Sequence, residues 1–563
     1  MCAIGSAGTA PKYLSSLPPS GWEAFFSELA RVDFAWIDAH RRALLGREAA
    51  KDGSEFEPIK AHPVEASGEE LARLGQAAIA AGEVAVAVFA GGAASRFFSA
   101  DAGAIDGSAG AVKGLCPATP VAGFSFLERF AFELLEEGMH AGRLPVWILM
   151  TSSVTDRAIR AWLSRAPLRG FAKERVMVLC QGANPRLDMD GDLVASPDGR
   201  LLWTGNGHGG IFTELLRRED GGDRPVDRLL SLGVRHLLLH NVDNLCAHPL
   251  WPARLGYHVR AGHDMTLSAV ARVNPKEKLG IFAQRARDGV IEVLEYSVCP
   301  PAIACAEAHG GSLAFRLGHI NTNIVRLDAV RADIPPTLYR NKRVSAGGRS
   351  FETSTFEMLN QSLASLLEPA RVGVFQVSRD FFRPAKSLRG EDSLEEAKTY
   401  LCREHARRLC ALGARVDASA LVELDPALGL EGPWQNNDTP FLRGAGKGWR
   451  VESGARMYLG VRHALSSEMP PYGEKLVVGK GATFWVEAEM PYGKIRCSQD
   501  GKVTEDPESA GKILLGRDVR ISSDACIRIR IHGDGRALVP DGARLSGNSD
   551  VVVPAGATVT LGG

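Results

Sequence analysis

Short apolar runs alternate with longer amphipathic segments between residues 84 and about 390. The runs of strand length are VAVAVFA (84–90), PVWILMT (145–151), RVMVLC (175–180), VRHLLLHNV (234–242) and MTLSAVA (265–271). The segments between them, such as FSFLERFAFELLEEG, VTDRAIRAWLSRA and GIFTELLRRED, repeat apolar residues at helical spacing. Because buried strands that alternate with helices form sheets covered on both faces, the pattern predicts an α/β fold with a mostly parallel sheet.

Two flanking regions have other patterns. Residues 20–47 place apolar residues on one helical face, which predicts an N-terminal helical segment. After about residue 450, stretches such as VVGKGATFWV and VPAGATVTL predict short stacked strands in a β-solenoid or β-roll, with a β-sandwich as the alternative. We expect a helical segment (1–82), an α/β domain (83–392), a helical connector (393–449) and a β-rich domain (450–563). Edge strands of the last could join copies of the chain.

The composition argues against several classes of protein. The chain of 563 residues has 66 Lys and Arg and 66 Asp and Glu, so no bulk charge favours nucleic acid or an anionic membrane surface. We find no uninterrupted apolar run of membrane-spanning length. The opening MCAIGSAGTAPKYLSS does not read as a secretory signal, and ten scattered cysteines without CxxC pairs favour free thiols. We therefore expect a cytoplasmic protein that binds neither nucleic acid nor membrane.

Two short motifs suggest phosphate chemistry. Gly91 and Gly92 end a buried strand, where they could let backbone amides approach a nucleotide or form only a tight turn. The stretch fits neither GxGxxG nor GxxxxGK[ST]. Arg96 and Lys113 follow and could meet phosphates. Asp243, in HNVDN after another buried strand, could hold Mg²⁺ or cap the next helix.

Taken in order, a series of motifs resembles the UTP-dependent sugar-1-phosphate uridylyltransferases, also called UDP-sugar pyrophosphorylases. The motifs are VFAGGAASRF, VKGLCPATPVAGFSFLERFAFEL, PVWILMTSSVTDRAI, LCQGANPRLDMDGDLV, GNGHGGIFTEL, HNVDNL, VLEYSV, INTNIV and VSRDFFRPAK. The resemblance spans roughly residues 84–390. It implies a Rossmann-like, GT-A-like nucleotidyltransferase core, and the helical segment and β-rich tail suit the three-part layout of that family.

The resemblance implies roles for individual residues. The family positions that hold the nucleotide match Gly91, Gly92, Gln181, His208 and Gly209. Those that bind sugar hydroxyls match Glu295, Asn321 and Asn323. The cations that face the phosphates match Arg96, Lys113 and Lys386, and Asp243 would share Mg²⁺ with phosphate oxygens.

The implied reaction suits these residue types. A sugar 1-phosphate oxygen attacks the α-phosphorus of UTP in line, and pyrophosphate leaves, so the protein mainly positions the two anions and neutralises their charge. Each residue also has an ordinary structural interpretation. Lys113 could be a solvated loop lysine, Gln181 a turn residue, and Lys386 one half of a surface ion pair, while Asn321 and Asn323 could be strand-end caps.

The sugar is the least determined part of the prediction. INTNIV and FFRPAK resemble the glucose branch of the family, so glucose 1-phosphate is our first expectation. The N-terminal helix and GNGHGG resemble the N-acetylglucosamine and broad-specificity branches. Ala94, where relatives have glycine, and the long stretch 99–112 favour an alternative of another class, a catalytically silent protein that binds a UDP-sugar as a regulator.

Overall fold

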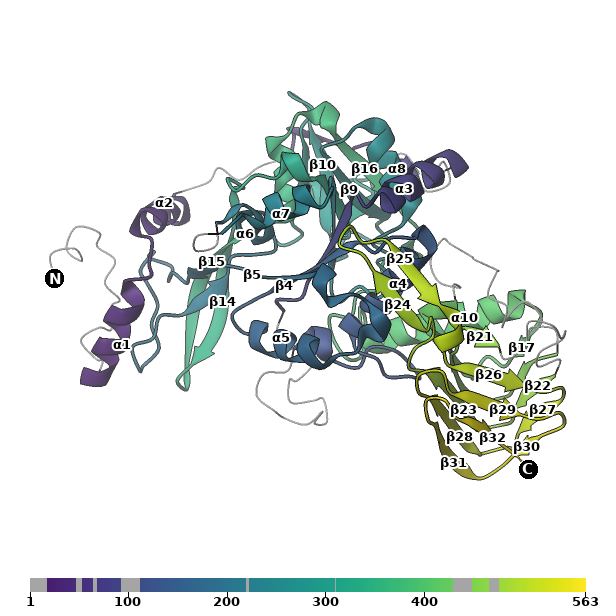
Figure 1. Ribbon diagram of the computed structural model, residues 1–563. Helices are drawn as coiled ribbons and strands as arrows, with labels where there is room; N and C mark the ends of the chain where they lie inside the picture. Colours follow the sequence, from purple (N-terminus) through teal and green to yellow (C-terminus); the bar gives the residue numbers. More distant parts are fainter. Residues whose placement is uncertain are drawn as a thin grey trace.

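The structure is a computed structural model in which an α/β body lies between an N-terminal helical part and a C-terminal β-rich part (Figure 1). It describes residues 18–46, 53–63, 68–92, 112–218, 222–308, 310–428, 448–464 and 475–562. Ala94, Arg96 and all of the stretch 99–112 except Val112 lie outside the described residues. In the described ranges, no helix is long and apolar enough to cross a membrane.

A 12-stranded sheet forms the centre of the molecule. Along its main path the strands are β1 (Phe56–Glu57), β10 (Gly280–Arg285), β12 (Leu317–His319), β9 (Met265–Ala271), β13 (Asn323–Arg326), β8 (His236–Asn241), β3 (Val84–Phe89), β4 (Val146–Thr151) and β5 (Val176–Cys180). Off this path lie β11 (Ile291–Leu294), which pairs with β10, and β16 (Val372–Gln376), which pairs with β9 and with β2 (His62–Pro63).

The sheet is mixed, which corrects the prediction of a mostly parallel sheet. Strands β8, β3, β4 and β5 pair in parallel, as does β16 with β9 and β2. The pairings made by β1, β10, β11, β12 and β13 are antiparallel. Parallel neighbours need a long crossover that is usually helical. In their described residues, the connections from β9 to β13 contain only the short helix α9 (Pro301–Ala304), so these strands turn back antiparallel.

Helices cover both faces of the parallel half of the sheet. Every residue of β3 is therefore buried. The valines of β3 pack with α3 (Glu69–Ala81), α4 (Phe126–Ala141), α5 (Asp156–Arg165) and α8 (Pro252–Ala261). Its alanines and Phe89 pack with α6 (Gly210–Leu216) and α7 (Pro225–Ser231). Helix α4 begins with a capping box between Ser125 and Glu128.

The N-terminal segment contains two helices, α1 (Pro19–Leu29) and α2 (Phe34–Leu45), ahead of α3. Asp33 begins α2, because its side chain accepts a hydrogen bond of 3.1 Å from the Trp36 backbone amide. The Trp36 ring meets Phe356 edge-on, with centroids 5.7 Å apart. Phe356 belongs to the hairpin β14 (Pro336–Ala346) and β15 (Arg349–Met358), so the helices pack on this hairpin beside the sheet (Figure 1).

The C-terminal part consists of three ladders in which every pairing is parallel. The first contains β17 (Arg415–Val416), β19 (Arg450–Val451), β22 (Leu476–Val478), β27 (Val519–Ile521) and β30 (Arg544–Leu545). The second contains β18 (Leu421–Leu424), β20 (Arg456–Gly460), β23 (Thr483–Ala488), β28 (Cys526–Ile531) and β31 (Asn548–Val553). The third contains β21 (His463–Ala464), β26 (Lys512–Leu515), β29 (Arg536–Val539) and β32 (Thr558–Thr560). Strand residues that point inward form one apolar core, against which α10 (Leu394–Ala411) packs.

A hairpin from the β-rich part reaches back to the α/β domain. It consists of β24 (Lys494–Cys497) and β25 (Val503–Asp506). The backbone amide of Leu144 donates to the Gly501 carbonyl at 2.9 Å, and that of Val503 donates to the Gly142 carbonyl at 3.1 Å. These bonds tie the hairpin to the turn between α4 and β4.

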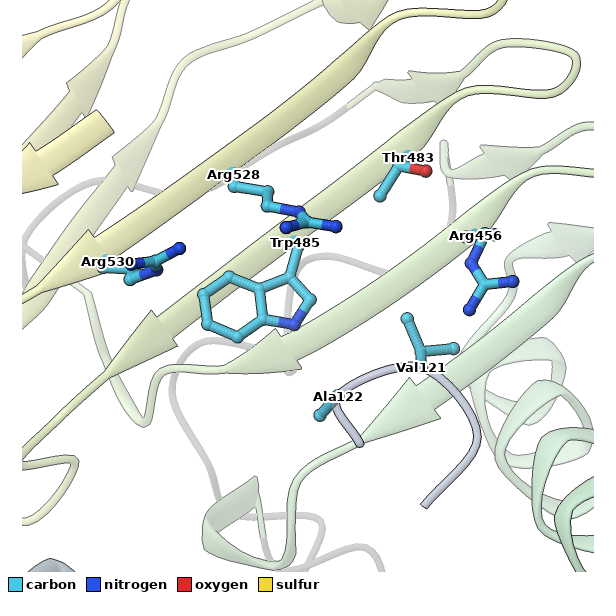
Figure 2. Close-up of a pocket in the computed structure, with 7 residues that line it drawn as sticks. All are labelled: Val121, Ala122, Arg456, Thr483, Trp485, Arg528 and Arg530. Atoms are coloured by element: carbon cyan, nitrogen blue, oxygen red, sulfur yellow. The ribbon is translucent and has the colours of Figure 1, made fainter. Parts of the chain in front are cut away.

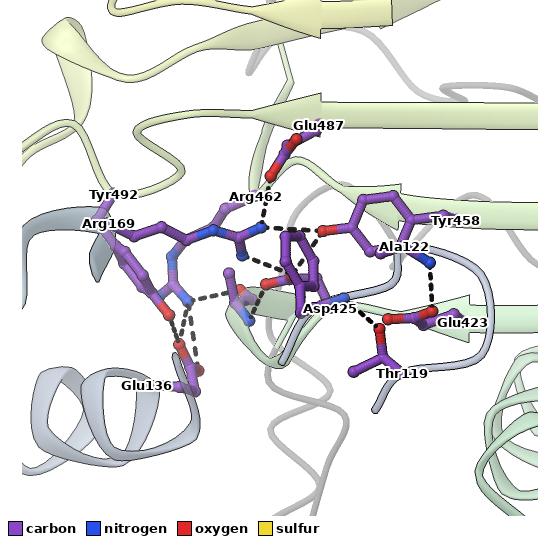
Figure 3. Close-up of polar contacts among 12 residues, drawn as sticks. Thr119, Ala122, Glu136, Arg169, Glu423, Asp425, Tyr458, Arg462, Glu487 and Tyr492 are labelled. Carbon is purple, nitrogen blue, oxygen red and sulfur yellow. Dashed lines mark hydrogen bonds and ion pairs between the residues drawn. The ribbon is translucent and has the colours of Figure 1, made fainter. Parts of the chain in front are cut away.

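A buried charge cluster also joins the two parts (Figure 3). Arg169 of the α/β domain donates to Asp425 at 2.5 Å and to Tyr458 and Glu487 of the β-rich part at 3.0 Å each. Its guanidinium carbon also lies 4.0 Å from the centre of the Phe132 ring. The Arg169 side chain is 4% exposed and that of Asp425 is 0% exposed. The pair is therefore sealed from water.

A second group of charges lies beside the Arg169 cluster. Arg462 contacts Glu136 of α4 at 3.2 Å, and the Tyr492 hydroxyl donates to the same carboxylate. Burial raises the pKa of Glu136 to about 7, although Arg462 and the Tyr492 hydrogen bond act in the opposite direction. Together the two groups fix the position of the β-rich part on α4 and on the segment that carries Arg169.

Candidate active site

The predicted site residues gather at the carboxyl ends of the parallel strands, where loops meet in α/β folds. Gly91 follows β3, Gln181 follows β5, and Asp243 follows β8. These three strands lie in the same parallel half of the sheet, so their ends share one edge. Asn321 precedes the antiparallel strand β13, which pairs with β8, and therefore reaches the same edge.

The Gln181 side chain lies against two glycines. A Cβ atom added at Gly91 would lie 3.1 Å from the Gln181 Nε2 atom, and one added at Gly205 would lie 2.4 Å from it. The Ser152 hydroxyl donates to the Gly91 carbonyl at 2.8 Å and so holds the turn after β3. At Gly92 an added Cβ would meet no described residue within 4 Å. The structure therefore brings Gly91 and Gln181 together. Gly205 also lies against the Gln181 side chain, and a larger residue at position 205 would displace the glutamine amide.

His208 is held in one tautomer. Its Nδ1 accepts hydrogen bonds from the Asn360 backbone amide at 3.0 Å and from the Asn360 side chain at 2.8 Å. Its ring stacks on Phe89, with centroids 5.2 Å apart. Desolvation, followed by the proximity of His319, lowers the pKa of His208 to about 3. The ring is thus neutral and carries its hydrogen on Nε2, which makes Nε2 a hydrogen-bond donor.

Backbone contacts place His208. The amide of Gly209 donates to the Met358 carbonyl at 2.8 Å. Gly207 has a φ of +90°, and a Cβ added there would lie 2.3 Å from the same carbonyl. Only glycine suits this close approach in the left-handed region. The GNGHGG turn therefore rests directly on the end of β15, next to Asn360.

A chain of asparagine amides forms the floor of the site. Asn360 donates to Asn321 Oδ1 at 2.7 Å, and Asn321 donates to Asn241 Oδ1 at 2.8 Å. Asn323, which is 0% exposed, donates to Asn360 Oδ1 at 2.6 Å. The Oδ1 atom of Asn323 faces His319 Nε2 at 3.0 Å. The amide of Asn323 is thus engaged by protein groups, which favours a role in holding Asn321 and Asn360 rather than contact with a ligand.

Glu295 lies at one end of this floor. Its Oε1 accepts a hydrogen bond from Gln361 Nε2 at 2.8 Å. Burial raises the pKa of Glu295, and the nearby charge of Glu357 acts in the same direction. Gln361 directly follows Asn360 in the chain, so one short segment orders both the asparagine floor and this carboxylate.

Two of the predicted phosphate and metal groups, Lys113 and Asp243, lie together. Lys113, in the 3₁₀ turn Lys113–Leu115, contacts Asp243 at 2.8 Å, and both side chains are partly exposed. The Ala385 backbone amide donates to the Asp243 carbonyl at 2.9 Å, which brings the segment that bears Lys386 next to Asp243. Lys386 itself contacts Asp392 at 2.8 Å. Asp243 does not cap the next helix, because α8 begins after Trp251.

The Asp243 carboxylate has the ligand chemistry that a Mg²⁺ ion prefers. Within the described ranges, no three His, Cys, Asp or Glu side chains gather as a metal-binding group. Mg²⁺ usually binds one or two carboxylates together with substrate phosphates and water. Asp243 supplies one such carboxylate, and its exposed side leaves room for other oxygen ligands.

Several residues of the site were missed from the sequence. They are Ser152, Gly205, Asn241, Asn360 and Gln361. Asn241 stands two residues before Asp243 in HNVDN, so its position at a strand end could have identified it. Asn360 and Gln361 follow the irregular strand β15, whose mixed pattern gave no such signal. Arg96 lies outside the described residues, so its predicted place at the phosphates stays a prediction.

The fold and this arrangement define an α/β protein whose predicted site residues gather at the carboxyl edge of a mixed sheet. Comparison with known proteins agrees. The family described as UTP--glucose-1-phosphate uridylyltransferase matches residues 135–390. This match confirms the resemblance to the sugar-1-phosphate uridylyltransferases that the motifs predicted.

Curated relatives point in the same direction. UDP-N-acetylglucosamine diphosphorylase 1 of Arabidopsis thaliana is 25% identical over 298 residues, which cover 51% of this chain and 57% of that protein. UDP-N-acetylglucosamine pyrophosphorylase of Saccharomyces cerevisiae is 25% identical over 430 residues, which cover 74% of this chain and 80% of that protein. The match thus spans little more than half of the Arabidopsis relative.

Solved structures share the fold. The UDP-N-acetylglucosamine pyrophosphorylase of Trypanosoma brucei, in complex with an inhibitor, aligns with a TM-score of 0.64 and 19% identity over 78% of this chain and 94% of that one. A UDP-glucose pyrophosphorylase mutant of Leishmania major aligns with a TM-score of 0.53 and 17% identity over 95% of this chain and 100% of that one. At these identities the comparison establishes the α/β fold with its mixed sheet.

Proposed function

We propose that this protein is a uridylyltransferase that forms a UDP-sugar and pyrophosphate from UTP and a sugar 1-phosphate. The observation that carries the proposal is the Lys113–Asp243 pair, which lies beside the segment bearing Lys386 at the carboxyl edge of the sheet. A cation and a carboxylate that are only partly buried can exchange their mutual contact for phosphate and metal. The matching family and relatives support the same class of reaction.

In this proposal the nucleotide lies along the sheet edge. The uracil would rest at Gly91, Gly92 and Gln181, where the two glycines leave backbone groups accessible. The neutral ring of His208, with Nε2 as donor and Gly209 beside it, would complete this end. The triphosphate would extend toward Lys113, with Arg96 as a second cation.

The sugar phosphate would occupy the other side of the same edge. Asn321 would present its amide to sugar hydroxyls, with Asn323 behind it, and Glu295 would accept a hydroxyl hydrogen bond. The phosphate oxygen would attack the α-phosphorus of UTP in line while Lys113 and Lys386 neutralise the added charge. Asp243 would hold a Mg²⁺ ion, whose charge would offset the negative charge that develops on the pyrophosphate.

Two sugars compete as substrate. The name of the matching family supports glucose 1-phosphate, our first expectation from the sequence. The names of the Arabidopsis and yeast relatives support N-acetylglucosamine 1-phosphate. Because both relatives are only 25% identical to this chain, we propose the class of reaction and treat the sugar as the quantity to be measured.

Other parts of the prediction join this proposal. The parallel ladders suit a β-solenoid-like C-terminal domain, and their last strands, β30, β31 and β32, provide edges through which copies of the chain could associate. A cytoplasmic location remains part of the proposal, because no disulfide joins the described cysteines.

The test is pyrophosphate release from UTP and Mg²⁺ with glucose 1-phosphate, N-acetylglucosamine 1-phosphate and galactose 1-phosphate in turn. ATP, CTP, GTP and dTTP serve as nucleotide controls. Release that requires UTP and one sugar establishes the reaction and identifies the sugar, and release with several sugars indicates broad specificity. Absence of release from folded protein that binds a UDP-sugar contradicts the proposal and favours the silent regulator.

A further inference from the structure

A pocket of about 280 Å³ lies on the outward face of the β-rich part, where β20, β23 and β28 meet the loop before α4 (Figure 2). None of the candidate active-site residues lines it. Val121 and Ala122 of the α/β domain form one wall, and Arg456, Trp485, Arg528 and Arg530 line the rest together with Thr483. The pocket is thus made where the α/β domain stops covering the second ladder.

The parallel register brings the basic side chains together. Trp485 of β23 pairs directly with Arg528 of β28. Arg530 lies two residues further along β28, and Arg456 of β20 pairs with Thr483, two residues before Trp485. Side chains two residues apart on a strand point to the same face, and neighbouring strands are about 4.8 Å apart. Three guanidinium groups therefore surround one indole ring, as Figure 2 shows.

The positive charge of this pocket is only partly compensated. Arg530 pairs with Asp550 at 2.9 Å, and Arg456 reaches the Pro120 carbonyl at 3.5 Å. Arg528 has no hydrogen bond or ion pair within the described part of the chain. The neighbouring acid on this face, Glu487, is held by Arg169. The lining itself contains three arginines and no acid.

This chemistry is that of a site for a phosphorylated ring compound. Arginine side chains bind phosphate oxygens through paired, charge-assisted hydrogen bonds, and an indole face packs against a sugar or a base. The volume is close to the lower end of about 300–1,000 Å³ for small-molecule pockets, which suits one ring and one phosphate. We propose that the pocket is a second binding site, for a phosphate monoester carried on a sugar or nucleoside ring.

A ligand in this pocket would touch the segment that carries Lys113. The backbone amides of Val121 and Ala122 donate to Glu423 Oε2 at 2.6 Å and 2.7 Å. The same segment closes on itself, because the Ala118 amide donates to the Phe124 carbonyl at 2.7 Å. Only this short, hydrogen-bonded stretch separates the pocket wall from the turn at Lys113. Occupancy of the pocket would therefore change the position of Lys113, a consequence that rests on the proposed function.

The first experiment measures binding by calorimetry on the full chain. Glucose 6-phosphate and AMP carry the same phosphate monoester on a sugar and on a nucleoside, and inorganic phosphate tests the anion alone. We expect one of the two ring compounds to bind, and R528Q to weaken that binding by about 10- to 100-fold, the range for loss of a charge-assisted hydrogen bond. R536Q, which removes an exposed arginine from a different ladder, is the matched control and should bind like the native protein.

The role of the indole is tested separately with W485L. This variant should weaken binding of the ring compound and leave the affinity for inorganic phosphate unchanged. Equal affinity of the native protein, R528Q and R536Q for every probe would overturn the site. So would the absence of binding at millimolar concentrations, provided that all variants unfold at the same temperature.

The coupling is measured by hydrogen exchange of the Val121 and Ala122 amides. Binding of the ring compound should slow their exchange in the native protein and in R536Q, but not in R528Q at the same concentration. If binding and protection occur while no sugar supports pyrophosphate release, the second site stands and the proposed function fails. If pyrophosphate is released but R528Q binds every probe as the native protein does, the proposed function stands and the second site fails.

Discussion

Two ion pairs of this protein are similar in length and different in surroundings. Arg169 and Asp425 meet at 2.5 Å in the junction between the domains, and Lys113 and Asp243 meet at 2.8 Å in the candidate site. The junction side chains are 4% and 0% exposed, whereas those of the site are 14% and 21% exposed. The junction pair also binds Tyr458. One pair is therefore completed by the protein, and the other can still be reached from solvent.

This difference separates a structural role from a chemical one. A sealed pair cannot exchange its partner without leaving a buried charge, so it fixes the domains in one arrangement. A pair near the surface costs little to separate, because water and ions screen both charges. Lys113 can turn to a phosphate, and Asp243 to a metal, without unfolding their surroundings. Four changes test whether this contrast holds, and they are ordered by the size of the expected effect.

The largest effect is expected for Arg169→Ala. It leaves the Asp425 carboxylate buried with Tyr458 as its remaining side-chain donor. Removing one partner of a buried ion pair destabilises by about 3–5 kcal/mol. Chemical unfolding should show this loss, with the β-rich part released first if the two domains unfold separately.

The matched control is Arg160→Ala. Arg160 also pairs with an aspartate, Asp156 at 2.8 Å, but its side chain is 53% exposed. Its loss should change the free energy of unfolding by less than about 1 kcal/mol. Equal effects of the two variants would show that burial does not distinguish the junction from the surface.

The next effect is on turnover, for Lys113→Ala. If the pair of the site is open to exchange, this change should leave stability nearly unaltered and remove charge stabilisation from the transition state. Loss of one preorganised electrostatic group lowers kcat by about 10²–10³-fold. Pyrophosphate release under saturating UTP and Mg²⁺ measures it, with Lys480→Ala, an exposed lysine of the β-rich part, as control. A destabilised variant with native kcat would place Lys113 among the structural groups.

These two regions also differ in how far the sequence predicts them. The strands that precede Gly91, Gln181 and Asp243 are long apolar runs, so their place at one sheet edge follows from the pattern alone. The antiparallel half was not predicted, because β11, β12 and β13 have only 4, 3 and 4 residues and the only helix in their described connections is the four-residue α9. Individual strands were visible in the pattern, whereas the direction of neighbouring strands depends on long-range pairing.

The asparagine floor and the junction escaped prediction for a related reason. Asn360 is joined to Asn321 and His208 across long sequence separations, and a lone asparagine after a strand has no periodic signal. Arg169 lies in a short turn between α5 and β5, where the sequence alone predicts an exposed arginine. Its partner Asp425 is distant in the sequence and meets it only in the folded protein. Polar groups that find their partners only on folding cannot be paired from local pattern.

A smaller effect is expected for Asn360→Ala, which breaks the floor of the site. The change removes side-chain hydrogen bonds to His208 and Asn321, and it leaves Asn323 Nδ2 with only the longer bond of 3.4 Å to Asn321 Oδ1. Buried groups that lose a partner cost about 1–3 kcal/mol. The KM for the sugar phosphate should rise more than the KM for UTP, because Asn321 loses its support. Asn274→Ala, in an exposed turn, is the control and should leave both KM values unchanged.

The smallest effect is a difference in pH response between the two regions. Burial lowers the pKa of His319 in the site floor to about 4, below its usual 6.5, and raises the pKa of Glu136 at the junction to about 7, above its usual 4.5. Between pH 4.5 and 6.5, unfolding therefore binds a proton at the histidine and releases one at the glutamate. The stability that His319 contributes is present above pH 6.5 and lost on acidification. The contribution of Glu136 is present below pH 4.5 and lost as pH rises through 7.

The variants His319→Gln and Glu136→Gln separate the two contributions. Urea unfolding at several pH values between 4.5 and 6.5 gives the free energy of each variant relative to the native protein. With rising pH, the free energy of unfolding of the native protein should rise relative to that of His319→Gln. It should fall relative to that of Glu136→Gln, and each change should be up to about 1.4 kcal/mol per pH unit. If both free-energy differences changed with pH in the same direction, His319 in the site floor and Glu136 at the junction would not differ in how folding changes their protonation. Opposite slopes would show that the floor keeps its histidine neutral while the junction carboxyl takes up a proton on folding.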